Sequence, residues 1–148
     1  MKNIVSIIFT CFICLTVNAQ NDFTKSLNGI ERVQIESKTD VVVKTQNNNQ
    51  LLIKAGKNVE IPEQAKGLRL VGEGGTDNTN VGFMVEQKGN TLLVRNLRKE
   101  GKAEIFLPAN QNIAVKSMAL NDIEITGFTG EVEATAEVVG SITIKDVT

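Results

Sequence analysis

The 148-residue chain lacks histidine, tryptophan and tyrosine, and its two cysteines, Cys11 and Cys14, both lie near its start. Without histidine, the commonest general base and the commonest metal ligand are missing. Six phenylalanines are the only aromatic residues, so any hydrophobic core must be mainly aliphatic. The sequence therefore predicts a protein that is not an enzyme and that has no catalytic, cofactor-binding or metal-binding residues.

The first nineteen residues are typical of a signal peptide. Lys2 precedes an apolar run from Ile4 to Val17, and Val17-Asn-Ala19 provides the small residue that a signal peptidase requires before its cut. The alternative is a retained N-terminal anchor, but the run is short for a span of about 20 residues. Neither cysteine follows the Leu-x-Gly/Ala pattern of a lipoprotein signal. We expect cleavage after Ala19 and export to the periplasm, the outer-membrane surface or the medium.

Cleavage would leave residues 20–148, which is 129 residues (148 less 19) and enough for a single domain. This part carries 15 Lys and Arg (16 less Lys2) against 17 Asp and Glu, a net charge of −2. Such a balance argues against nucleic acid and anionic membranes as partners. We also expect no stable membrane insertion after cleavage, and no disulfide, because both cysteines leave with the signal.

Alternating β-branched and polar residues predict strands through the first two thirds of the mature chain. The predicted strands are Val33–Ile35, Val41–Val43, Leu51–Ile53, Leu68–Leu70, Val81–Val85, Thr91–Val94 and Ala103–Leu107. Only Ile61–Gly67 resembles a helix, with Pro62 at a first helical position. The polar segment Gly72–Asn80 is interpreted as a long loop, and Asn47–Asn49 as a solvated turn.

In the last third, aliphatic pairs return every nine or ten residues. The pairs are Ile113-Ala-Val115, Ile123-Glu-Ile125, Val132-Glu-Ala134 and Ile142-Thr-Ile144. Pairs two apart, such as Ile113 and Val132, are offset by nineteen residues, which is typical of repeat architectures. Gly130 and Gly140 precede two of the pairs and are expected to give the backbone freedom that sharp corners need. A β-sandwich is the alternative, but its connections vary in length, so the spacing favours a parallel β-solenoid.

Three segments of this region, Asn121–Gly127, Gly130–Ala134 and Gly140–Thr148, resemble a repeat of the form Gly-x-Ile/Val-x-Val-x-x-x-x-Gly. This repeat is similar to that of the exported bacterial "putative adhesin" β-solenoid domains, a family of unknown function related to auto-transporter adhesin head domains. The resemblance implies a right-handed parallel β-helix-like stack at the cell envelope and no catalytic residues. Asn121 stands where the family has Gly, and we expect it to occupy a left-handed corner.

Carboxylates are the remaining candidates for chemistry, and they concentrate in the repeat region. They are Asp122, Glu124, Glu131, Glu133, Glu137 and Asp146. Glu124 and Glu133 hold the middle, outward position of their pairs and could line one outer face together. Paired carboxylates can hydrolyse glycosides or bind calcium. A solvated sheet face is the favoured interpretation, because outward strand residues must be polar to keep a sheet soluble.

Three other motifs are weaker. Ser117 follows Lys116, but adjacent strand residues point to opposite faces, which argues against a Ser–Lys nucleophile. The glycines of 72–75 lack the Lys-Ser/Thr and the helix of a phosphate-binding loop. The only basic cluster, Arg95, Arg98, Lys99 and Lys102, could touch an acidic glycan or a lipid headgroup, although a charged hairpin tip is the simpler interpretation.

These observations predict a non-catalytic binding, adhesion or scaffolding module whose partner is a glycan or an envelope protein. A carbohydrate-active β-helix enzyme and an envelope-stress sensing domain are the alternatives. The sequence stops at Thr148, inside its own repeat. We expect either that it is truncated at its C-terminus, the favoured interpretation, or that its open last repeat docks another copy or a partner. In both cases the exposed end should favour self-association.

Overall fold

The computed structural model describes residues 22–56, 68–72 and 74–148. The predicted signal peptide at residues 1–19 and the helix-like segment 61–67 lie outside these described residues. Within them the protein is all-β, as predicted, with strands and no helix. The described part accordingly offers no helix of the length and apolar character needed to cross a bilayer.

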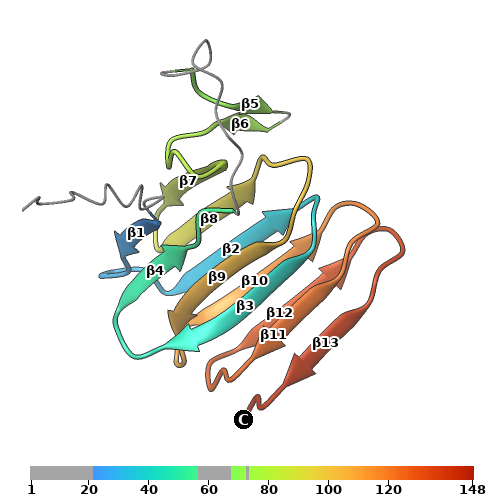
Figure 1. The fold of residues 1–148 in the computed structure, drawn as a ribbon. Helices are drawn as coiled ribbons and strands as arrows, with labels where there is room; N and C mark the ends of the chain where they lie inside the picture. Colours follow the sequence, from blue (N-terminus) through green and yellow to red (C-terminus); the bar gives the residue numbers. More distant parts are fainter. Residues whose placement is uncertain (1–21, 57–67, 73) are drawn as a thin grey trace, which may run out of the picture.

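The strands form two large sheets that face each other and one small hairpin (Figure 1). In chain order they are β1 Phe23–Ser26, β2 Arg32–Ser37, β3 Val41–Gln46, β4 Gln50–Ile53, β5 Val71–Gly72, β6 Gly75–Thr76, β7 Phe83–Lys88, β8 Thr91–Asn96, β9 Ala103–Pro108, β10 Asn112–Ser117, β11 Ile123–Thr126, β12 Val132–Ala136 and β13 Ile142–Lys145. The six-stranded sheet has the order β1-β4-β9-β3-β11-β13, and the five-stranded sheet has the order β12-β10-β2-β8-β7. Strands β5 and β6 pair only with each other among the described residues.

The core lies between the two large sheets and follows from the alternation in the sequence. In β2, Val33 and Ile35 are buried while the residues between them are partly exposed, and β10 repeats this pattern with Ile113 and Val115. The inward residues of both sheets join one aliphatic cluster, which Phe83 and Phe128 complete. Burial of these alternating side chains is the main force holding the sheets together.

Consecutive strands in the two sheets form rungs, each made of one strand from either sheet joined by a short corner. The rungs are β2–β3, β8–β9, β10–β11 and β12–β13, and every pairing between one rung and the next is parallel. Ile113 pairs with Val132 and Ile123 pairs with Ile142. The nineteen-residue offset in the sequence is thus the offset between paired strands of the last two rungs.

The rungs do not stack in chain order. Strands β2 and β3 lie between the later rungs β8–β9 and β10–β11 in both sheets. At one end of the stack, β1, β4 and β7 pair antiparallel with their neighbours, and β1 was not predicted as a strand. The observed class is therefore all-β with mixed parallel and antiparallel sheets. A right-handed parallel solenoid is a finer description that these pairings alone do not establish.

A network of buried polar side chains fills the corners of the middle rungs. Asn96 Nδ2 donates to Ser37 Oγ at 3.1 Å and to Thr39 Oγ1 at 2.8 Å. In the next corner, Ser117 Oγ donates to Asn121 Oδ1 at 2.9 Å, and Asn121 Nδ2 donates to the Thr39 carbonyl at 2.9 Å. These contacts pair the buried polar side chains with one another and give the Thr39 carbonyl a donor.

The structure corrects the predicted role of Asn121. The non-glycine residues with positive φ in the described chain are Asn80 and Asp146, so Asn121 is not in the left-handed region. It is buried, and its amide links two rungs through the corner network. A hydrogen-bonded side chain, not a permissive backbone, is the reason for asparagine at this position.

Gly130 and Gly140 also have a different role from the one predicted. Neither has a φ in the left-handed region. A Cβ on Gly130 would lie 2.6 Å from the Gln111 carbonyl oxygen, and one on Gly140 would lie 2.2 Å from the Asn121 carbonyl oxygen. These glycines are needed because the backbone of the preceding rung approaches too closely for any side chain.

The segment Gly72–Asn80, predicted as a long loop, is organised by the buried carboxylate of Asp77. Residues 75–76 form β6, which pairs with β5. Asp77 Oδ1 accepts hydrogen bonds from the backbone N–H groups of Thr79 and Asn80, and its Oδ2 accepts one from Gly82. The carboxylate thereby fixes the turn that leads into β7.

Candidate functional site

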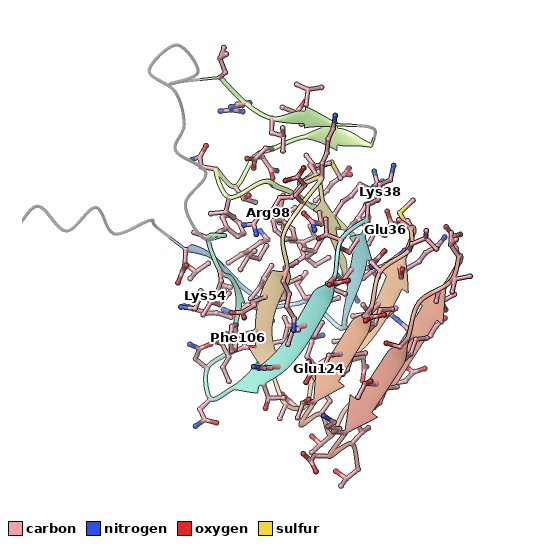
Figure 2. The ribbon with its side chains drawn as sticks, turned by 45° about the vertical axis from the view of Figure 1, so that its right-hand side comes forward. Glu36, Lys38, Lys54, Arg98, Phe106 and Glu124 are labelled. Atoms are coloured by element: carbon pink, nitrogen blue, oxygen red, sulfur yellow. The ribbon has the colours of Figure 1, made fainter. Side chains whose placement is uncertain are left out.

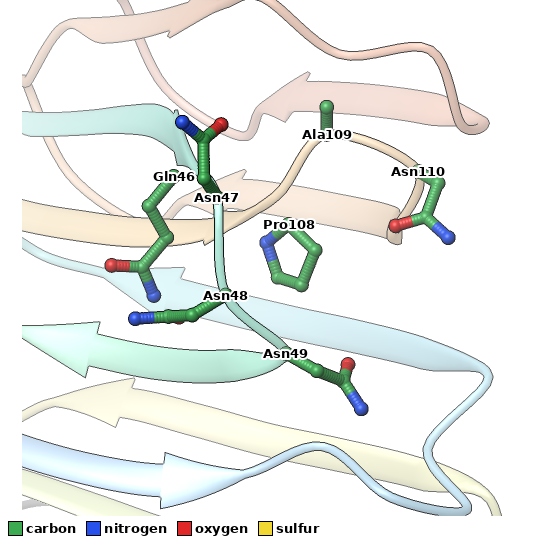
Figure 3. Close-up of a pocket in the computed structure, with 7 residues that line it drawn as sticks. All are labelled: Gln46, Asn47, Asn48, Asn49, Pro108, Ala109 and Asn110. Carbon is green, nitrogen blue, oxygen red and sulfur yellow. The ribbon is translucent and has the colours of Figure 1, made fainter.

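A polar hollow of about 440 Å³ lies at one end of the rungs, between the β3–β4 turn and the β9–β10 turn (Figure 3). Its lining residues are Gln46, Asn47, Asn48, Asn49, Pro108, Ala109 and Asn110. The two turns meet because β3 and β9 are parallel neighbours whose last residues, Gln46 and Pro108, are paired in register. The hollow is wide open to solvent and its lining is mainly polar, so a ligand would lie on it without being enclosed.

Each wall of the hollow has a local cause in the sequence. The Asn47–Asn49 run reverses the chain between β3 and β4, where asparagine is favoured. Pro108 ends β9 because its nitrogen cannot donate to a ladder, as the sequence predicted. Figure 3 shows the Pro108 ring between the asparagine turn and the following residues Ala109 and Asn110.

Two of the amides are held by the protein and three are not. Gln46 Nε2 donates to the Gln50 carbonyl at 2.6 Å, and Asn49 Nδ2 donates to Asn28 Oδ1 at 2.8 Å. Asn47, Asn48 and Asn110 are exposed, and their amides have no side-chain hydrogen bond to any described residue. The turn is thus anchored on one side and presents free amides on the other.

The chemistry of this lining is neutral and rich in hydrogen-bonding groups. Every primary amide carries two N–H donors and an oxygen acceptor, so it can engage a pair of neighbouring hydroxyls at once. No residue of the lining is charged. The arrangement suits an uncharged ligand with many hydroxyl groups.

A smaller hollow of about 160 Å³ lies on the outer face of the six-stranded sheet, beside Asp40, Asp122, Lys102 and Glu124. Its carboxylates hold neighbouring rungs together. Asp40 Oδ1 accepts from the Asp122 N–H at 3.0 Å, and Asp122 Oδ1 accepts from the Ser141 N–H at 2.8 Å. The backbone hydrogen bond from Ser141 lowers the pKa of Asp122 from its ordinary value. The carboxylates of Asp40 and Asp122 in this hollow are therefore explained by the hydrogen bonds with which they join neighbouring rungs.

The predicted pairing of Glu124 with Glu133 on one outer face is wrong. Glu124 lies on β11 in the six-stranded sheet, whereas Glu133 lies on β12 in the five-stranded sheet. The two sheets face each other, so their outer surfaces point in opposite directions. At each corner the chain crosses from one sheet to the other, so the consecutive strands that carry Glu124 and Glu133 belong to different sheets. The alternation of apolar and polar residues in the sequence does not reveal this crossing.

The remaining repeat-region carboxylates are mostly in ion pairs. Arg32 contacts Glu133 at 2.7 Å and Glu131 at 3.6 Å on the outer face of the five-stranded sheet. Lys116 contacts Glu137 at 2.6 Å, and the hydrogen bond to Glu137 raises the pKa of Lys116. Among the described residues, no group of three or more acidic, cysteine or histidine side chains is placed to hold a metal ion.

The four residues of the predicted basic cluster lie in four different environments. Arg95 pairs with Glu36 at 2.7 Å on the outer face of the five-stranded sheet. Lys102 lies beside Glu124 at 3.7 Å, on the other sheet. Arg98 is half-buried, and burial lowers the pKa of its guanidinium. Lys99 is exposed and makes no ion pair with a described residue, so the four residues do not form one anion-binding patch.

Two further motifs lie where they have no catalytic geometry. Ser117 is buried and donates to Asn121, while Lys116 points to the outer face, as predicted for adjacent strand residues. Gly72 and Gly75 face each other in the β5–β6 hairpin. Figure 2 shows how widely the charged side chains Glu36, Lys38, Lys54, Arg98 and Glu124 are distributed over the two sheets.

Sequence reasoning missed the amide-lined hollow. It interpreted Asn47–Asn49 as a solvated turn and gave no role to Asn110. The available signal was that each segment lies just beyond a strand, β3 (Val41–Gln46) or β9 (Ala103–Pro108). Only the parallel pairing of these strands brings the two turns together.

No protein-family model and no curated protein matches this chain. Two solved structures are similar to it. A putative adhesin from Bacteroides fragilis NCTC 9343 is 18% identical, with a TM-score of 0.43 over 88% of this chain and 56% of that one. A putative cell adhesion protein from Clostridium sporogenes ATCC 15579 is 12% identical, with a TM-score of 0.41 over 82% of this chain and 58% of that one. The chain thus spans little more than half of either structure, and similarity at this level assigns neither a family nor a function.

Proposed function

We propose that the protein is a non-catalytic, exported binding module that holds a neutral glycan in the amide-lined hollow. One observation carries this proposal: three exposed amides without side-chain hydrogen bonds, those of Asn47, Asn48 and Asn110, surround the Pro108 ring. Amides of this kind match the alternating donors and acceptors of sugar hydroxyls. The Pro108 ring is itself buried, so the three asparagine amides are the groups available to a ligand.

The way the hollow is built supports the proposal. The register of β3 and β9 fixes its two walls, and the Asn49–Asn28 hydrogen bond fixes the turn. Loops positioned by a rigid sheet are the usual location of binding residues, since the scaffold limits the entropy lost on binding. The proposal includes the right-handed stacking of the rungs and the export signal inferred from the sequence. Such a module would act in the periplasm or at the cell surface.

A panel of immobilised oligosaccharides tests the proposal directly. The unmodified protein should bind one or more neutral glycans, and Asn48→Ala combined with Asn110→Ala should weaken binding at least tenfold. Each lost hydrogen bond is worth about 0.5–1.5 kcal/mol. Gln87→Ala is the matched control, because Gln87 is an exposed amide on β7, away from the hollow.

Two results would contradict the proposal. One is the absence of binding to every neutral glycan on the panel. The other is equal binding by the double variant and the unmodified protein. Mass spectrometry of the bound glycans after prolonged incubation should show no cleavage, whereas cleavage would favour the carbohydrate-active enzyme as the alternative.

A further inference from the structure

The last rung exposes aliphatic side chains that are buried in the rung before it. Ile142 and Ile144 of β13 are 41% and 46% exposed, whereas their partners Ile123 and Ile125 of β11 are 1% and 0% exposed. Strands β12 and β13 are the last strands of their sheets, so the outer backbone edge of each has no partner among the described strands (Figure 1). We call the surface formed by β12 and β13 the open end.

At the open end, each of the two facing sheets ends in a strand with one unpaired edge, β12 in one sheet and β13 in the other. A single extended peptide can lengthen only one of these sheets. Covering both requires a partner that presents two strand edges at the same separation, with apolar side chains between them. The open end of a second copy has the same two strand edges at the same separation, with the same apolar side chains between them, and therefore meets this requirement.

We propose that two copies of the chain associate through their open ends, related by a two-fold axis that runs along the strand direction. Strands β12 and β13 lie in different sheets and run in opposite directions (Figure 1). Rotation about this axis therefore places β13 of one copy antiparallel to β12 of the other. Each six-stranded sheet then continues into the five-stranded sheet of the second copy, and both edges are paired.

The sequences of the two strands fit this pairing in one register. Between the sheets, Ile144 lies opposite Ala134 of the second copy, and Ile142 lies opposite Ala136. Large residues thus meet small ones, as close packing requires. On the outer face, Thr143 lies opposite Thr135.

The same register also pairs opposite charges. Lys145 lies opposite Glu133 of the second copy, and no ion pair of Lys145 with any described residue occurs within one chain. Glu133 contacts Arg32 of its own chain at 2.7 Å, so Lys145 would join that ion pair from the second copy. The other two-fold arrangement, with its axis normal to the sheets, would set β13 against itself. Because β13 contains no acidic residue, that arrangement gives Lys145 no acidic partner on the facing strand.

Mixed cysteine cross-linking tests the register. The full chain carries Cys11→Ser and Cys14→Ser, so that its only thiol is the one introduced. Two variants, Thr135→Cys and Thr143→Cys, are made with different affinity tags and exposed to a mild oxidant separately and together. Facing residues in an antiparallel pair have Cβ atoms about 4.5–5.5 Å apart, close enough for a disulfide.

We expect a disulfide dimer that contains one copy of each variant, and at least tenfold less dimer from either variant alone. A Thr143→Cys dimer that forms equally well alone would indicate the other two-fold axis and overturn the proposal. A monomeric mass for the uncross-linked protein at every concentration, by analytical ultracentrifugation, would also overturn it. That result would mean that this end is left bare or is covered by a different partner.

Charge reversal provides a second, independent test. Lys145→Glu places two acidic residues opposite each other in both sheets and should raise the dimer dissociation constant at least tenfold. Adding Glu133→Lys to this variant should restore association. Lys44→Glu is the matched control, since Lys44 is exposed on β3 of the same sheet, away from the open end. Equal dissociation constants for Lys145→Glu and Lys44→Glu would refute the pairing.

Discussion

The guanidinium of Arg98 lies over the ring of Phe83, with its central carbon 5.0 Å from the ring centroid. The same group donates from Nε to the Val81 carbonyl at 2.8 Å and from one terminal nitrogen to the Lys54 carbonyl at 3.0 Å. One side chain thus joins the turn before β7 to the end of β4. Residues 54–56 and 77–82 belong to no strand, and Arg98 ties both segments to the core.

Arg98→Ala should lower the free energy of unfolding by about 2–4 kcal/mol. The variant loses the cation–π contact and leaves two half-buried carbonyls without a donor. Urea unfolding followed by circular dichroism measures the difference. The neighbouring exposed residue gives the control, because Lys99→Ala should change stability by less than about 0.5 kcal/mol. Similar losses for both variants would show that the Arg98 contacts do not stabilise the fold.

Ile123→Asp should unfold the protein or destabilise it by more than about 4 kcal/mol. Ile123 is fully buried, and loss of a core aliphatic alone costs about 2–5 kcal/mol before the buried charge is added. Glu124→Lys, one residue along the same strand, should change stability by no more than about 0.5 kcal/mol because its contact with Lys102 is exposed. Equal effects would contradict the assignment of inner and outer faces.

Asn121→Gly separates two explanations for this asparagine. If Asn121 were needed for a left-handed backbone, glycine would be tolerated or would stabilise the protein. The structure instead predicts a loss of about 1–3 kcal/mol, because Ser117 and the Thr39 carbonyl each lose a buried partner. Asn121→Ala should give a similar loss. Thermal unfolding of both variants distinguishes the two outcomes.

Asp22 should give the protein a small stabilisation that is lost in acid. Its carboxylate accepts from Lys54 Nζ at 2.7 Å and from the Ala55 N–H at 2.9 Å. The hydrogen bond from Lys54 is the main cause of a pKa below the ordinary value of 3.8. Because the pKa is lower in the folded state, the stabilisation is present above pH 3.8 and declines as the pH falls through the folded pKa.

The corresponding variant is Asp22→Asn. It should be less stable than the unmodified protein at pH 7 by less than about 1 kcal/mol, since the pair is partly exposed. The two proteins should become equally stable near pH 2. Urea unfolding at both pH values measures this, and a difference that persists at pH 2 would show that a group other than the carboxylate is responsible.

The sequence predicted most of the strands, because alternate residues of these strands lie in one core. The predicted strand Leu68–Leu70 is wrong: these residues are exposed and form no strand, and pairing begins at β5, Val71–Gly72. The pairs Val33–Ile35 and Ile113–Val115 are buried as the alternation requires. It did not predict the strand order, because Val33 pairs with Leu92 and Ile113, and no local pattern specifies partners so far apart. The amide-lined hollow was missed for the same reason, because its two walls are turns that only the pairing of β3 with β9 brings together. Gly130 was misjudged because its constraint is a carbonyl of another rung, not its own conformation.

The position of β2 and β3 in the middle of the stack affects how the chain can fold. These strands are made early, yet their lateral partners β8 to β11 all lie between residues 91 and 126. The β2–β3 pair therefore emerges with both edges unpaired and must wait for more than half of the chain before it is enclosed. Such non-local pairing is expected to make folding slow, on a timescale of about milliseconds to seconds. During synthesis, the edges of β2 and β3 are the part of the molecule most in need of protection from aggregation.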